Sequence, residues 1–74
     1  MDAFTKMRSV LAALATQIAD VEDEAALMFE ARALTSSDRG SELRGHADAA
    51  RKFAAEERAR AAEYSAPVAQ TAVE

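Results

Sequence analysis

Large apolar side chains recur along the first half of the chain at alternating steps of three and four residues. This spacing lines them up along one side of a helix, and it is the heptad pattern of a helix that packs lengthwise against another helix. The pattern runs without a slip from residue 4 to residue 32. We therefore expect a helix at about residues 3–34, with a hairpin core formed by Phe4, Met7, Leu11, Leu14, Ile18, Val21 and Met28.

The second half of the chain repeats the spacing with smaller side chains. It predicts a helix at about residues 38–64, whose share of the hairpin core is Leu43, Ala47, Ala50 and Ala54. Alanine at these positions allows the two helix axes to approach closely. Glu57 falls on the same line. The pattern leaves open whether Glu57 is buried with a polar partner or meets water where the helices splay apart.

A polar segment at residues 35–41 is the only interior break in the helical pattern. Ser36, Ser37 or Asp38 can cap the second helix, as Asp2 can cap the first, because such side chains accept hydrogen bonds from free backbone amides. A connection this short requires the helices to lie antiparallel. Residues 1–65 are thus expected to form one all-α antiparallel hairpin. Residues 66–74 lack periodicity and are expected to form a disordered tail.

The chain is too small for a lone hairpin to be comfortably stable. It has 74 residues and no cysteine, and domains of this size usually need disulfides, metal or association. Association, with a homodimeric four-helix bundle favoured, is the route that remains. Large apolar residues outside the heptad core predict the oligomer or partner interface, namely Leu27, Phe29, Leu34 and Phe53.

A stripe of small residues runs beside the heptad core on the first helix, at Thr5, Ala12, Ala19, Ala26 and Ala33. This stripe is either a second contact surface or a set of solvent-exposed alanines that raise helix propensity.

The charge pattern narrows the choice of partner. A formal net charge of −4 disfavours a general nucleic-acid or anionic-membrane binder. The longest strictly apolar run, residues 10–15, is too short to cross a membrane, so a cytoplasmic location is expected. Antiparallel pairing about the turn predicts an ion pair between Arg51 and either Glu22 or Glu24.

Few residues have side chains that could act in catalysis or bind a metal ion. His46 is the single histidine, and it has no thiol or second imidazole with which to form a catalytic or metal pair. The acidic residues of the segment 20–24 spread around a helix, so they do not converge on a cation as metal ligands must. The expected protein is therefore not an enzyme and has no catalytic residues, cofactor or metal site.

The expected architecture and the segment Leu43-Arg44-Gly45-His46-Ala47-Asp48 resemble the Rop family of plasmid copy-number regulators. The resemblance implies a helical hairpin that dimerises into an antiparallel four-helix bundle. In that family the outer face of the first helix binds RNA through basic and polar residues. Here the corresponding face is acidic at residues 20–24. The resemblance therefore supports a four-helix bundle more than it supports RNA binding.

The function class that fits these observations is a small non-enzymatic helical protein that self-associates and binds a partner protein, as an adaptor, regulator or inhibitor. One alternative is a Rop-like nucleic-acid-binding regulator that uses Arg44, Arg51 and Arg58. Another is a small acidic inhibitor of the phage type, whose carboxylates imitate nucleic acid.

Overall fold

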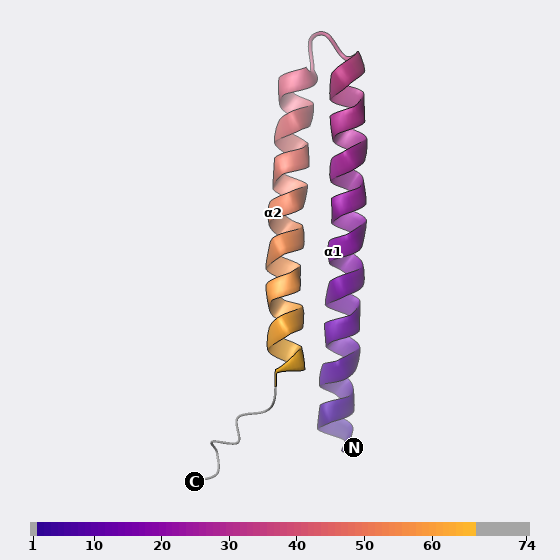
Figure 1. Cartoon of the computed structure of the whole chain (residues 1–74), viewed down its shortest axis with the longest axis vertical. Coiled ribbons are helices and arrows are strands. Elements are labelled where there is room, and N and C mark those ends of the chain that lie inside the picture. Colours follow the sequence, from indigo (N-terminus) through magenta and orange to yellow (C-terminus); the bar gives the residue numbers. More distant parts are fainter. Residues whose placement is uncertain (1, 67–74) are drawn as a thin grey trace.

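The protein is described by a computed structural model for residues 2–66, which form two helices packed side by side. Helix α1 spans Ala3–Thr35 and helix α2 spans Gly40–Ser65. The two helices lie antiparallel, so that the end of α2 is near the start of α1 (Figure 1). The predicted tail, from residue 67 onward, lies outside the described residues.

The two helices begin differently. The Asp2 carboxylate caps α1 as predicted, by accepting a 2.7 Å hydrogen bond from the backbone N–H of Thr5. The prediction that Ser36, Ser37 or Asp38 caps α2 is wrong, because α2 begins at Gly40 and its N-cap residue Arg39 makes no side-chain capping bond. Arg39 instead bonds through its side chain to Glu42 in the first turn of α2, at 3.3 Å.

Gly40 explains where α2 begins. This residue is buried where α2 passes the end of α1. A Cβ atom at this position would lie 3.3 Å from the backbone oxygen of Ala33, which is a tight contact. A glycine therefore lets the chain turn back immediately against α1.

Helix α1 faces α2 with alanines rather than with its large side chains. The buried residues of α1 are Ala15, Ala19, Ala26 and Ala33, and the half-buried Ala12 continues the same line. We call these five residues the alanine stripe. Ala12, Ala19, Ala26 and Ala33 belong to the small-residue line noted in the sequence, so this part of the line is a contact surface, whereas its first member, Thr5, is exposed.

The predicted hairpin core is therefore wrong for α1 and correct for α2. Phe4, Met7, Leu11, Leu14, Ile18, Val21 and Met28 are all exposed in the hairpin, with 36–61% of each residue accessible. We call these seven residues the apolar stripe. On α2, the predicted residues Leu43, Ala47, Ala50 and Ala54 are all buried against α1. The physical reason is that small side chains on both helices let the axes approach closely, whereas a leucine or phenylalanine in either line would force them apart.

Candidate interaction surface

The apolar stripe holds seven of the eleven large apolar residues that the hairpin leaves exposed in the described chain. It extends from Phe4 to Met28 along one side of α1, which is roughly 36 Å at the rise of an α-helix. Val10 adds a further exposed apolar side chain beside it. Contiguous apolar patches of this extent on a soluble protein mark interaction sites.

The position of the apolar stripe follows from its register with the alanine stripe. Leu11 and Ile18 of the apolar stripe each directly precede an alanine that faces α2, Ala12 and Ala19 respectively. Successive residues of an α-helix are rotated by about 100° around its axis. The apolar stripe therefore lies about a quarter turn away from the surface of α1 that contacts α2.

Aromatic residues extend this apolar surface toward α2. Phe53 of α2 is 39% exposed and lines a groove between the helices together with Glu22, Phe29 and His46. Glu22 also borders a second groove, formed by Leu14, Gln17, Ile18 and Val21 of the apolar stripe. The shared residue places Phe53 and the apolar stripe on the same side of the hairpin.

Phe29 has a role within the hairpin that the sequence reasoning missed. The sequence predicts it at the oligomer or partner interface, but it packs against the buried cluster of Ala26, Ala47 and Ala50. Its ring also lies 5.3 Å from the His46 imidazole, centroid to centroid. Phe29 is only half-buried, so its outer edge still contributes to the apolar surface.

Leu27 and Leu34 are exposed, by 60% and 87% respectively, but on the other flank of α1. Each of them directly follows a residue of the alanine stripe, Ala26 or Ala33, whereas Leu11 and Ile18 of the apolar stripe directly precede Ala12 and Ala19. The 100° rotation per residue then turns the two leucines away from the apolar stripe. They provide a matched control for any test of that stripe.

Ion pairs join the two helices along the edge of the interface opposite the grooves. Arg51 pairs with Glu30 through two hydrogen bonds, and Arg58 pairs with Asp20 at 2.9 Å and with Asp23 at 2.8 Å. The predicted pairing of Arg51 with Glu22 or Glu24 is wrong, because the helices meet in a register that places Glu30 beside Arg51. Glu22 and Glu24 form no ion pair within residues 2–66.

These ion pairs shift the pKa values of the side chains that form them. The hydrogen bond from Arg51 lowers the pKa of Glu30, with the positive charge adding to the effect and partial desolvation opposing it. The hydrogen bonds to Asp23 and Asp20 raise the pKa of Arg58. Two of the three arginines that could contact phosphates are thus already bound to carboxylates.

The sequence left open whether Glu57 is buried with a polar partner or meets water, and the structure answers this question. It is buried in the α2 surface that faces α1, with 8% of the residue accessible. Its carboxylate accepts a hydrogen bond from the exposed Arg60 guanidinium, one turn further along α2. A buried charge is tolerated when it is paired in this way, and no buried side-chain polar atom of the described residues lacks a partner.

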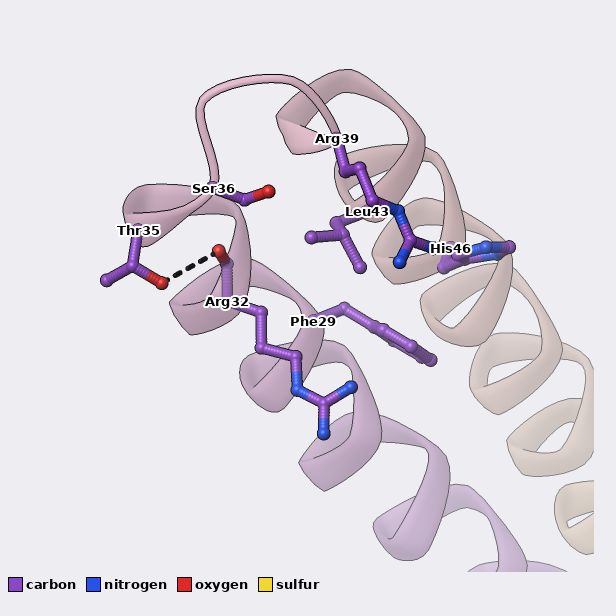
Figure 2. A pocket seen from close by; sticks show the side chains of 7 residues that line it. All are labelled: Phe29, Arg32, Thr35, Ser36, Arg39, Leu43 and His46. Carbon is purple, nitrogen blue, oxygen red and sulfur yellow. Dashed lines mark hydrogen bonds between the residues drawn. The ribbon is translucent and has the colours of Figure 1, made fainter.

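A separate pocket of about 380 Å³ lies at the turn, where Figure 2 shows side chains from the end of α1 and the start of α2 around it. Arg32 and Arg39 line this pocket, together with Phe29, Leu43 and His46. Glu42 pairs with Arg39 and lies 3.8 Å from the His46 imidazole. Since this carboxylate offsets one of the two positive charges, the pocket is a weaker candidate site than the apolar stripe.

Within residues 2–66, no group of three or more histidine, cysteine or acidic side chains has a geometry that could hold a metal ion. Neither described helix combines the length and the hydropathy needed to cross a bilayer. Comparisons with protein-family models, curated proteins and solved structures find no match for this chain. The apolar surface of the hairpin is therefore the main guide to its function.

Proposed function

We propose that this chain is a small non-enzymatic interaction protein that self-associates and acts by binding other helices through the apolar stripe of α1. The observation that carries the proposal is that small apolar side chains are buried while large ones are exposed, which is the reverse of the usual arrangement in a folded domain. The buried hydrophobic residues of the described chain are Leu43 and alanines, while eleven larger apolar side chains are at least 36% exposed.

The energetic argument follows from side-chain size. Burial of apolar surface stabilises a fold by about 25 cal/mol per Å², and an alanine side chain offers little area. Apart from Leu43, the hairpin therefore places its smallest apolar residues inside and leaves large apolar residues in water. A partner helix on the apolar stripe would supply the missing burial, as small domains without disulfides or metals generally require.

The quarter-turn offset between the two stripes favours a bundle. A helix at one corner of a four-helix bundle contacts two neighbours that lie about 90° apart around its axis. In this chain α2 occupies one of these positions on α1, and the apolar stripe marks the other. Two hairpins joined along their stripes would thus form a four-helix bundle.

The ion pairs on the opposite edge support this assignment over nucleic-acid binding. A phosphate-binding surface presents cations that are free of carboxylates, whereas Arg51 and Arg58 are bound to Glu30, Asp20 and Asp23.

The test compares two double variants, each of which replaces two large aliphatic residues with serine. Leu14→Ser with Ile18→Ser removes apolar groups from the centre of the stripe, and Leu27→Ser with Leu34→Ser removes them from the other flank. We expect wild type and the second variant to be helical dimers or larger in size-exclusion light scattering with circular dichroism. The first variant should be monomeric and less helical.

The opposite pattern would refute the assignment. If the Leu14 and Ile18 substitutions leave association unchanged while the Leu27 and Leu34 substitutions abolish it, the interaction surface lies on the other flank. A wild-type chain that is monomeric, fully helical and cooperatively folded would show that the stripe needs no partner.

A further inference from the structure

We infer that the occupant of the apolar stripe is the α1 helix of a second copy of this chain, which lies antiparallel and is centred on Thr16. This inference rests on the proposed function, and it adds the identity, direction and register of the partner helix. It is carried by two independent properties of α1, namely the self-complementarity of the stripe and the distribution of its unpaired charges.

The stripe matches itself when it is reversed about Thr16. In this register four pairs of positions face one another across the two copies, and each pair occurs twice because of the two-fold symmetry. The pairs are Phe4 with Met28, Met7 with Ala25, Leu11 with Val21, and Leu14 with Ile18. Each pair but one joins two large side chains, and the exception sets the small Ala25 against the flexible Met7.

Shifting the register by one heptad in either direction loses contacts. One shift leaves Ala25 and Met28 without facing residues. The other leaves Phe4 beyond the stripe and brings the charged Arg32 opposite Met7. The register centred on Thr16 is the one that buries every residue of the apolar stripe and keeps Arg32 outside the overlap.

The charged residues near the stripe also favour an antiparallel arrangement of the two α1 helices. Arg8 lies near the start of α1, and Glu22 and Glu24 lie in its second half. None of these three residues forms an ion pair with another residue of the described chain. Antiparallel pairing brings the basic end of each α1 alongside the acidic segment of its partner.

Arg8 and Glu22 are the two charges that the proposed register brings together. The Arg8 guanidinium lies 5.8 Å from the Phe4 ring centroid and 6.0 Å from that of Tyr64, and it donates a hydrogen bond to the backbone oxygen of Glu63. Glu22 borders the groove lined by Leu14, Ile18 and Val21. In the proposed register Arg8 of one copy falls between the same layers of apolar residues as Glu22 of the other. A parallel pair would instead align the two acidic segments with each other and set Arg32 against Arg32.

Cysteine cross-linking tests the direction and the register, because residues 2–66 contain no cysteine. The single variants are Leu11→Cys, Val21→Cys and Leu14→Cys in the full chain, and circular dichroism checks that each is helical. A disulfide requires Cα atoms within about 7 Å, so an equal mixture of Leu11→Cys and Val21→Cys should give roughly tenfold more dimer than either variant alone. A mixture of Leu11→Cys and Leu14→Cys is the control for a register shifted by one heptad.

The outcomes separate this inference from the proposed function. Cross-linking of Leu11→Cys with itself would show parallel pairing, and cross-linking of Leu11→Cys with Leu14→Cys would show a shifted register. Either result overturns the inference while leaving the stripe as the binding surface. A monomer by light scattering, with no cross-link in any mixture, overturns the inference of a second copy altogether.

Exchanging the charges of Glu22 and Arg8 gives an independent test of the antiparallel arrangement, read from the Kd of the dimer. Glu22→Arg should weaken the dimer by roughly tenfold in Kd, because it faces Arg8 of the partner with a like charge. Adding Arg8→Glu to the same chain should restore the affinity, since the pair is then reversed. Unchanged affinity in Glu22→Arg, or no recovery in the double variant, would contradict the antiparallel arrangement.

Discussion

Charged residues on one edge of the hairpin pair across the two helices. Arg51 binds Glu30 with both of its terminal nitrogens, and Arg58 bridges two carboxylates one turn apart on α1. Exposed ion pairs contribute little stability each, so their main effect is on register. They favour the alignment that brings the alanines of the two helices into contact.

The lowered pKa of Glu30 predicts a dependence of stability on acid. A carboxylate whose pKa is lower in the folded state stabilises that state above its unfolded pKa, ordinarily about 4.3 for a glutamate, and the contribution is lost as pH falls through the folded pKa. Glu30→Gln should therefore lower the urea midpoint at pH 7, and the difference from wild type should shrink as pH falls below about 4.

Glu56→Gln is the control for this prediction, because Glu56 is exposed and forms no ion pair within residues 2–66. It should leave the midpoint unchanged at both pH values. A difference between Glu30→Gln and wild type that persists undiminished in acid would mean that the ion pair is not its cause.

At the scale of the elements, the contact between α1 and α2 depends on the absence of large side chains. Ala19, Ala26 and Ala54 have no accessible surface at all. The stabilisation comes from close contact between the helix backbones and methyl groups, each atom pair contributing a small dispersion energy. Such an interface has no room to accept larger groups.

Ala26→Leu should consequently destabilise the hairpin although leucine is more hydrophobic and nearly as helix-favouring as alanine. Forcing extra methylene groups into a closely packed interface costs about 1–3 kcal/mol. Denaturant unfolding at one fixed protein concentration measures the loss. Ala13→Leu, at an exposed position on the same helix, should change the unfolding free energy by less than about 0.5 kcal/mol. Equal effects of the two substitutions would argue against close packing at Ala26.

At the scale of the whole molecule, folding and association are expected to be one process. The hairpin interior offers little apolar area, and most of the hydrophobic surface of α1 lies outside it. Stability then depends on the amount of partner available, since ligands and subunits that bind only the folded state stabilise it by mass action.

The thermal midpoint of the wild-type chain should therefore rise with protein concentration. Circular dichroism melts over roughly a hundredfold range of concentration measure the dependence, which mass action requires for a dimer that unfolds to monomers. The variant carrying Leu14→Ser and Ile18→Ser should melt at one temperature throughout this range. A midpoint that is independent of concentration in the wild-type chain would contradict coupled folding and association.

The sequence alone determined the local structure, because helix formation depends on signals that lie within a few residues of one another. The alternating spacing, the polar segment after residue 34 and the Asp2 cap are such signals, and α1 and α2 end within two residues of the expected bounds. The single line of small apolar residues on α2 also identified its buried side, at Leu43, Ala47, Ala50 and Ala54.

Which side of α1 faces α2 depends on how the two helices pack together. Two lines with the same three-and-four spacing run along α1, one residue apart in sequence, and periodicity cannot rank them. Hydrophobicity favoured the line of Leu11 and Ile18, whereas close packing against the alanines of α2 required the line of Ala19 and Ala26. That requirement is a property of two surfaces in contact, as is the pairing of Arg51 with Glu30, so neither could be found from the pattern along one helix.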